Sequence, residues 1–276
     1  MSMATIPLAA ARPATGALRG DYSAMSADYA VAQDWGRYGA AEHELWRRLY
    51  QRQSRLVPSY ACAEFNEALS RLDAAGAIPR FDDISRKLRA ATGWEIVPVP
   101  GLIPDETFFT HLANRRFPAT VWLRRPEEFD YIVEPDVFHD CFGHVPLLFE
   151  PAYADHLQEY GKGGLKALKQ DALPLLARLY WYTIEFGLLR TAAGPKVYGA
   201  GILSSGGEMT YATEDPRPKR PAFALERVMR TDYRIDSYQD TYFVIDGFAQ
   251  LLRDTAPDFT PIYSRLKTLP VLRPDA

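Results

Sequence analysis

Apolar side chains recur at helical spacing over most of the chain. Between residues 41 and 56, leucine and aromatic residues repeat three or four positions apart, and arginines occupy several of the polar positions between them. Such spacing is typical of an amphipathic helix that buries one face. We predict helices over residues 41–56, 65–72, 82–91, 106–115, 157–168, 173–189, 222–229 and 247–253.

Strand patterns are few and short. The segment 94–101, WEIVPVPG, predicts a strand outside the middle of a sheet, because Pro98 and Pro100 lack the N–H that a central strand needs. Residues 117–123 and 242–245 alternate well enough for strands, and 196–203 is strand or loop with glycines that allow close backbone approach. The balance predicts an α+β, predominantly helical fold. We expect one domain over residues 21–276, preceded by a flexible N-terminal tail over residues 1–20.

Composition excludes several classes of protein. Hydrophobic residues make up 47% of the chain and charged residues 24%, as in ordinary globular proteins. The formal net charge is −3 and basic residues are scattered, so neither a nucleic-acid site nor a membrane partner is expected. The two cysteines, Cys62 and Cys141, form no CxxC pair. This predicts a reducing, cytoplasmic location without structural disulfides.

Two histidines stand five residues apart in the segment EPDVFHDCFGHVPLLF. On a regular α-helix His139 and His144 would differ by about 140° in direction, so they would not share a face. Gly143 and Pro146 favour a helix that ends near Gly143, which would let the two imidazoles converge. The alternative is a pair of core histidines that each hydrogen-bond to backbone.

One carboxylate, Glu185, lies in the long apolar stretch 173–189. A buried carboxylate needs a cation, a metal or a set of hydrogen-bond donors. Arg178 and Arg190 are the nearby candidate partners, but Arg178 is seven residues away and Arg190, at five, lies on another helix face. Joined to the two histidines, Glu185 would complete the two-histidine, one-carboxylate set that binds non-haem Fe(II) and leaves coordination positions open.

Zinc hydrolases also use two histidines and a glutamate. Their usual HExxH motif places the histidines four apart on one helix, with the catalytic glutamate between them. Here the motif is HDCFGH, with the histidines five positions apart and Asp140 at the place of that glutamate. The spacing argues against the peptidase template, but a zinc hydrolase that uses the same three ligands stays an alternative.

Four stretches resemble the tetrahydropterin-dependent aromatic amino acid hydroxylases: PVPGLI, EPDVFHDCFGHVPLL, LARLYWYTIEFGL and VYGAGILSSGGE. The likeness extends from about residue 22 to residue 255 and is closest to the compact bacterial phenylalanine 4-hydroxylases. It implies the single catalytic domain of that family. The chain has room for neither the regulatory domain nor the tetramerisation helix of the animal enzymes, so we expect a monomer.

The resemblance assigns roles to individual residues. His139, His144 and Glu185 would be the iron ligands, and Ser204 would support His139 from behind. Arg124 would bind the substrate carboxylate, although the residues alone suggest a solvated arginine. Phe108 would stack on the pterin, although it could equally be helix core. The implied substrate site also comprises Pro135, Asp136, Tyr180, Trp181 and Ile235, and the implied pterin site comprises Gly101, Leu102, Ile103, Phe108 and Asp140.

The resemblance implies an Fe(II)- and tetrahydropterin-dependent monooxygenase that converts L-phenylalanine to L-tyrosine with O2. The pterin would be tetrahydrobiopterin or a related reduced pterin. Trp181 stands where tryptophan hydroxylases of the family carry phenylalanine, and Ile235 where tyrosine hydroxylases carry an acidic residue. Both favour phenylalanine, with a tryptophan hydroxylase as the alternative. The segment before EPD reads DYIV, where the animal enzymes have a Tyr-Thr-Pro run. Ile132 therefore stands in place of their threonine, and no role in substrate binding is carried over to it.

Overall fold

Amphipathic helices dominate the structure, as the apolar spacing predicts. The chain is described by a computed structural model that covers residues 18–235 and 237–275. The α-helices are α1 Ala40–Tyr60, α2 Ala63–Leu72, α3 Phe81–Ala91, α4 Asp105–Ala113, α5 Pro151–Leu168, α6 Leu173–Tyr180, α7 Ala200–Ser204, α8 Glu208–Glu214, α9 Leu225–Arg230, α10 Phe248–Thr255 and α11 Thr260–Lys267. Two π-helices, His139–His144 and Trp181–Glu185, and 3-10 helices at Trp35–Arg37, Pro126–Glu128 and Val145–Phe149 complete the helical part.

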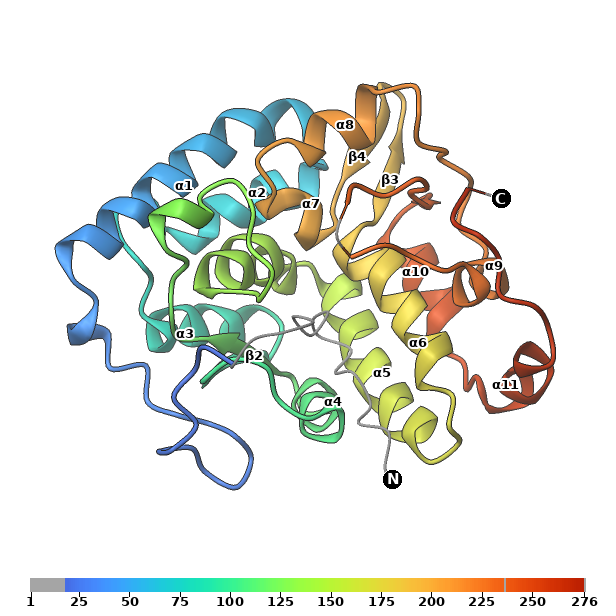
Figure 1. Ribbon diagram of the computed structural model, residues 1–276, viewed down its shortest axis with the longest axis horizontal. Coiled ribbons are helices and arrows are strands. Elements are labelled where there is room, and N and C mark those ends of the chain that lie inside the picture. The colour runs from blue at the N-terminus through green and yellow to red at the C-terminus, as the bar shows by residue number, and fades with distance from the viewer. Residues whose placement is uncertain (1–17, 236, 276) are drawn as a thin grey trace.

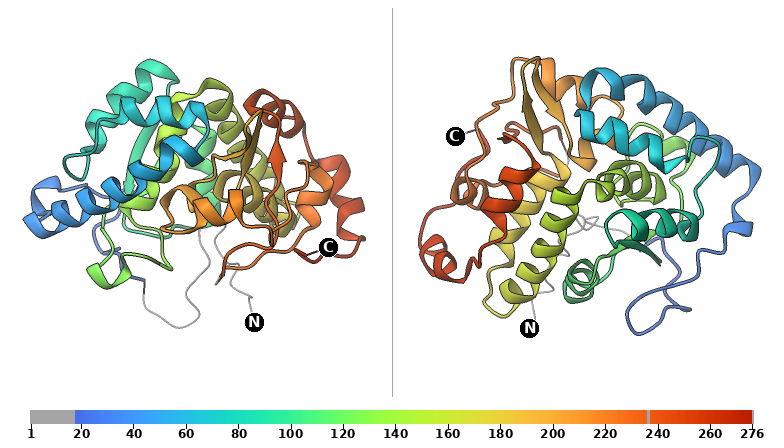
Figure 2. Two further views of the ribbon diagram at one scale, coloured as in Figure 1. Left: turned by 90° about the horizontal axis from the view of Figure 1, so that it is seen from above. Right: turned by 180° about the vertical axis from the view of Figure 1, so that it is seen from behind.

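The chain passes through the molecule from one side to the other. Helices α1 to α3 lie on one side and α9 to α11 on the other, with α5 and α6 between them (Figure 1). The views from above and from behind keep this order (Figure 2). Helix α5 packs against both α4 and α10, so it joins the early and late parts of the chain. Most of the predicted tail, residues 1–17, lies outside the described residues, and its boundary at residue 20 stays a prediction.

Five short strands form two separate sheets. Strands β1 Glu95–Val99 and β2 Arg116–Thr120 pair in parallel, and β3 Leu188–Thr191 lies between β4 Gly194–Val197 and β5 Val244–Ile245. Pro98 is tolerated in β1 because each strand of a two-stranded sheet is an edge. The α+β, predominantly helical fold is therefore confirmed, with strands no longer than five residues in the described chain.

Two predictions of helix extent were wrong at the positions that matter most. The helix predicted to end near Gly143 instead continues as a π-helix to His144 and then as a 3-10 helix. The helix predicted over residues 173–189 changes to a π-helix at Trp181 and ends at Glu185, and Leu188 already belongs to β3. Apolar periodicity does not distinguish these helix types here, because almost every residue of the two segments is buried.

Close backbone approach explains the glycines of VYGAGIL. A Cβ at Gly199 would lie 2.4 Å from the Glu185 carbonyl oxygen and 2.5 Å from the Gly187 nitrogen. Any larger residue would therefore push α7 away from the π-helix that carries Glu185. The segment predicted as strand or loop is split, since β4 ends at Val197 and α7 begins at Ala200.

Several short helices and a strand were not predicted from the sequence pattern. Helices α8 and α11 and strand β3 were not predicted, because seven or eight helical residues, and four strand residues, give little periodicity. The helix predicted from residue 222 begins at Leu225, since Ala222 forms a bridge with Val244 instead. None of the helices in the described ranges combines the length and the apolar character that a bilayer crossing requires.

The packing of α5 against α4 gives a direct test of the fold. A Cβ at Gly164 would lie 2.0 Å from the Phe109 ring, whereas a Cβ at the neighbouring Gly163 would meet nothing within 4 Å. Gly164→Ala should lower the free energy of unfolding by about 1–3 kcal/mol through overpacking. Gly163→Ala should raise it by about 0.5–1 kcal/mol, because alanine favours the helix. Urea unfolding of both variants measures this, and equal stability of the two would contradict the packing.

Candidate metal centre and adjoining cavities

Two π-helices bring the predicted ligands together. In a π-helix the N–H of residue i+5 bonds to the carbonyl of residue i, so residues five apart lie near one another on successive turns. His139 and His144 are the first and last residues of one π-helix, and Glu185 is the last residue of the other. Within the described chain these three residues form the group whose ligand atoms lie within 4.8 Å of one another. The predicted clustering is confirmed, but a π-turn produces it rather than a helix stop.

The three side chains face each other closely. The Nε2 atoms of His139 and His144 are 3.1 Å apart, and the Glu185 carboxylate lies 3.7 Å from the first and 3.2 Å from the second. Burial would raise the pKa of Glu185, but the two imidazoles outweigh burial and lower it. Burial would lower the pKa of His144, but Glu185 outweighs burial and raises it. A divalent cation at this point would replace the shared proton, so the donor set fits a metal ion.

His139 is oriented from behind by Ser204. The Ser204 hydroxyl donates to the Ala200 carbonyl and lies 2.9 Å from His139 Nδ1. Because its one hydrogen is used on Ala200, the hydroxyl accepts from Nδ1–H, which leaves Nε2 free to bind a metal. Burial lowers the pKa of His139 to about 4, so its imidazole is neutral, as ligation requires.

The arginines that could have neutralised Glu185 are engaged elsewhere. Arg178 lies 3.8 Å from Asp232, and Arg190 pairs with Asp246 at 2.8 Å. The Tyr180 hydroxyl hydrogen-bonds to Glu185 and adds a neutral donor. Among the described residues, the charge of Glu185 is therefore balanced by imidazole alone, and the explanation by an arginine pair is excluded.

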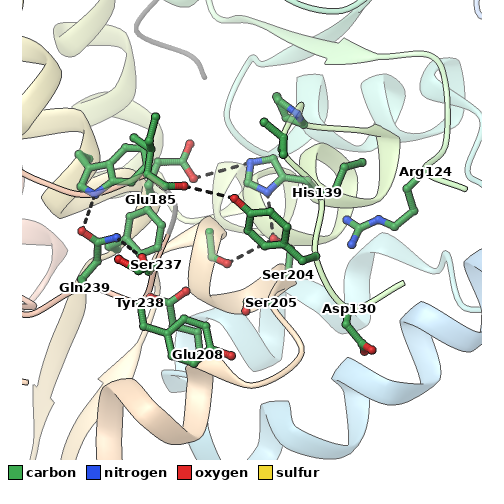
Figure 3. A pocket seen from close by; sticks show the side chains of 18 residues that line it. Arg124, Asp130, His139, Glu185, Ser204, Ser205, Glu208, Ser237, Tyr238 and Gln239 are labelled. Atoms are coloured by element: carbon green, nitrogen blue, oxygen red, sulfur yellow. Dashed lines mark hydrogen bonds and ion pairs between the residues drawn. The ribbon is translucent and has the colours of Figure 1, made fainter. Parts of the chain in front are cut away.

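A cavity of about 360 Å³ opens beside the three ligands. Figure 3 shows Arg124 and Glu185 on either side of His139, with Ser204 below them and Glu208 reaching in from α8. Predicted residues Arg124, Pro135, Trp181, Ser204 and Ile235 line this cavity, and so does Ile132. The lining that was not predicted comprises Asp130, Tyr131, Val133, Phe186, Gly201, Ser205, Glu208, Ser237, Tyr238 and Gln239.

Arg124 is buried rather than solvated. Its Nε and Nη2 atoms donate to the two oxygens of Asp136, both at 2.9 Å, while the neighbouring Arg125 is exposed. Burial would raise the pKa of Asp136, but Arg124 holds it below its usual value. Asp136 lies beneath Arg124 and does not line the cavity. The third guanidinium nitrogen, Nη1, does not take part in the ion pair with Asp136. Arg124 itself lines the cavity wall.

Aromatic side chains form another wall. Trp181 stacks on Tyr233 at 4.4 Å between ring centroids and packs on Phe186 at 4.6 Å. The Trp181 indole N–H donates to Gln239 at 3.0 Å, which ties the π-helix to the segment after Ile235. These contacts fix the indole plane, so a flat apolar ligand would meet a rigid surface.

A second, smaller cavity of about 30 Å³ lies on the other side of His139. It is lined by all the residues predicted for the pterin, namely Gly101, Leu102, Ile103, Phe108 and Asp140. Tyr180, predicted in the substrate pocket, lines this cavity instead, where its ring lies 6.0 Å from Phe108. Its backbone position precedes Trp181 directly, so the two side chains leave the helix in different directions.

Asp140 combines a backbone contact with a raised pKa. Its carboxylate accepts the Thr120 backbone N–H at 2.7 Å, and burial raises its pKa to about 7. His139 and Pro135 line both cavities, so the metal centre lies where the two meet. The larger cavity carries the guanidinium of Arg124 beside acidic side chains, whereas the smaller one carries the Asp140 carboxylate and no arginine, which makes them suited to different ligands.

Sequence reasoning missed several residues of the larger cavity. Glu208 ends the motif VYGAGILSSGGE, so its presence there was the one signal that could have identified it. Tyr238 and Gln239 belong to no motif that sequence reasoning had identified. Their side chains reach the cavity only because the chain after α9 folds back over the π-helix at Trp181.

Comparison with known proteins agrees with this geometry. Residues 17–263 match the model of the biopterin-dependent aromatic amino acid hydroxylases. Phenylalanine-4-hydroxylase of Chromobacterium violaceum is 58% identical over 240 residues, which cover 87% of this chain and 81% of that protein. Phenylalanine-4-hydroxylase of Ralstonia nicotianae is 56% identical over 251 residues, covering 91% and 80%.

Solved structures give the same result. The iron- and phenylalanine-bound crystal structure of phenylalanine hydroxylase from Chromobacterium violaceum superposes with a TM-score of 0.88 at 55% identity, covering 92% of this chain and 93% of that chain. The cobalt-bound structure from the same organism gives a TM-score of 0.90 at 56% identity, covering 91% and 92%. The chain belongs to the biopterin-dependent aromatic amino acid hydroxylase family.

Proposed function

We propose that this protein is an Fe(II)- and tetrahydropterin-dependent phenylalanine 4-monooxygenase, which forms L-tyrosine from L-phenylalanine and O2. The observation that carries the proposal is the buried His139–His144–Glu185 set at the junction of an arginine-bearing aromatic cavity and a second cavity. Several relatives between 46% and 58% identical bear the name phenylalanine-4-hydroxylase, which supports phenylalanine over tryptophan and oxygen chemistry over zinc hydrolysis.

The ligand set suits iron in oxygen chemistry. Two imidazoles and one carboxylate occupy one side of a metal ion and leave the other side for O2 and solvent. Iron and reduced pterin, when bound, supply the activation of O2 that aromatic hydroxylation requires. The protein's part is to hold the metal through His139, His144 and Glu185, and to keep both organic molecules beside it.

The larger cavity is proposed to hold the amino acid. Nη1 of Arg124 would donate to its carboxylate, while Asp136 keeps the guanidinium plane fixed. Trp181 and Pro135 would enclose the ring and exclude water from the reacting carbon. Ile132 and Ile235 contribute apolar surface and no charge, which favours phenylalanine over a phenol.

The smaller cavity is proposed to hold the pterin. Its backbone edge at residues 101–103 and the Phe108 ring would contact the bicyclic ring, with Asp140 near the amide. The rings of Tyr180 and Phe108, 6.0 Å apart between centroids, also line this cavity.

The proposal extends to location and assembly. Cys62 and Cys141 are buried free thiols, which supports a reducing, cytoplasmic setting. A monomer is expected, and light scattering of the purified protein tests it directly.

The ligand assignment predicts a loss of iron in three variants. His139→Ala, His144→Ala and Glu185→Gln should each lose stoichiometric Fe(II) and phenylalanine hydroxylation, because two remaining ligands do not hold the ion. Iron analysis after anaerobic reconstitution and a tyrosine-formation assay measure both, and circular dichroism checks the fold. His43→Gln, outside the site, is the control. A ligand variant with one iron per chain and normal turnover would remove that residue from the set.

The same reconstitution separates iron from zinc. If the protein is the proposed monooxygenase, Fe(II) should restore tyrosine formation and Zn(II) should not. Hydrolytic activity restored by zinc, without tyrosine formation by the iron form, would favour the hydrolase alternative.

The buried position of Arg124 predicts a specific effect on substrate affinity. Arg124→Lys keeps the positive charge beside Asp136 but loses the two-pronged guanidinium, so the fold and the iron should remain. The KM for phenylalanine should rise roughly 10- to 100-fold, as a charged hydrogen bond is lost. Arg125→Lys is the matched control, because Arg125 is exposed, and its KM should stay near that of the parent. Equal KM values for the two variants would remove Arg124 from the carboxylate site.

A further inference from the structure

A buried carboxylate in the larger cavity has no role in the functions assigned above. Glu208 is the first residue of α8, is only 6% exposed and lines the cavity wall. Its Oε1 atom accepts the Tyr242 hydroxyl at 2.7 Å, and the Gln239 backbone N–H also bonds to the carboxylate. Both partners are neutral donors, and no ion pair to Glu208 occurs among the described residues. A buried carboxylate with only neutral donors retains an unbalanced charge.

The other acidic groups of the cavity are already balanced. Asp130 pairs with Arg52 at 3.0 Å, and its side chain is 90% exposed. Glu185 faces the two imidazoles. Glu208 is therefore the cavity carboxylate that is both buried and without a cation, within the part of the chain that the structure describes. A cationic ligand group that enters this cavity has one free anionic partner.

The substrate class supplies such a group. An amino acid carries a carboxylate and an ammonium on the same carbon, and Arg124 lies in the wall of the same cavity as Glu208. In Figure 3 these two side chains come from different elements and lie on opposite sides of Ser204, with His139 above. We propose that Glu208 binds the α-ammonium group of the amino-acid substrate, so that the substrate is held by its two opposite charges. This inference rests on the proposed function, because it takes an amino acid as the ligand.

Electrostatics agrees with this assignment. Burial raises the pKa of Glu208 to about 7, since its two neutral donors compensate only partly for the loss of water. An ammonium group beside the carboxylate would favour the ionised form and regain the interaction that burial removed. An ammonium also has three donors, which a desolvated cavity must satisfy. Two anchors of opposite sign would thus select amino acids over simple carboxylates and simple amines.

The test uses two analogues of phenylalanine, one without the ammonium group and one without the carboxylate. The iron-loaded enzyme and its Glu208→Gln variant are compared for the KM of L-phenylalanine and for competitive inhibition by 3-phenylpropanoate and by 2-phenylethylamine. Glutamine keeps an oxygen that accepts the Tyr242 hydroxyl, so the fold should survive. Glu214→Gln, an exposed glutamate on the same helix, is the control with the same change of charge. Iron content and the thermal midpoint are measured for each variant.

We expect Glu208→Gln to raise the phenylalanine KM and the inhibition constant of 2-phenylethylamine roughly 10- to 100-fold. The inhibition constant of 3-phenylpropanoate should change by less than about threefold, because that ligand has no ammonium. Glu214→Gln should resemble the parent in all three. Equal weakening of all three ligands would show a merely structural role for Glu208, and no weakening would show that the ammonium binds elsewhere. Either result overturns the inference while leaving phenylalanine hydroxylation by the parent enzyme, which tests the proposed function, unaffected.

Discussion

The desolvated carboxylate of Glu185 is the constraint on which the rest of the site depends. It lies at the end of an apolar helix, where an isolated charge would cost several kcal/mol. Two imidazoles from a separate π-helix face it at 3.2 and 3.7 Å, and the nearby arginines pair elsewhere. The fold thus keeps a concentrated negative charge in its interior that only protons or a metal ion can balance. A metal ion bound by these three side chains would balance the charge of Glu185.

The backbone geometry of two π-helices positions His139, His144 and Glu185. Each ligand belongs to a π-helix, a form that is rare and often occurs at functional sites. One π-turn places two histidines five residues apart near each other, and the other carries Glu185 out of α6 before β3 begins. Gly199 lets α7 approach the Glu185 backbone, and α7 in turn carries Ser204, which orients His139. Close packing and ligand orientation are therefore parts of one arrangement.

A single aspartate connects Arg124 with the π-helix that carries His139. Asp136 accepts two guanidinium hydrogens from Arg124 and the backbone N–H of His139 at 3.0 Å. A displacement of Arg124 would therefore disturb the start of the π-helix that holds the metal ligand. His139 and Pro135 line both cavities, so the two organic ligands would meet the metal from different sides. The rim of the larger cavity is apolar and exposed at Tyr131, where the hydroxyl donates to the Ile235 carbonyl across the opening.

The sequence by itself determined the residues of the metal centre, the helical character of the fold and the likeness to a family. Local chemistry was sufficient for these, because two histidines, a carboxylate in an apolar helix and four motifs are all visible without coordinates. The residues expected around the pterin followed from the family resemblance, and all five of them line the smaller cavity.

Only the tertiary structure decided how those residues meet. Periodicity could not distinguish a π-turn from a helix stop, because nearly every residue of that segment is buried and no polar face marks its turn. It could not separate Tyr180 from Trp181, adjacent residues that line different cavities. Nor could it identify Glu208 as a cavity carboxylate, since that depends on α8, α7 and the chain around Gln239 coming together from distant parts of the sequence. Contacts of this kind follow from packing of the whole chain, which no local pattern records.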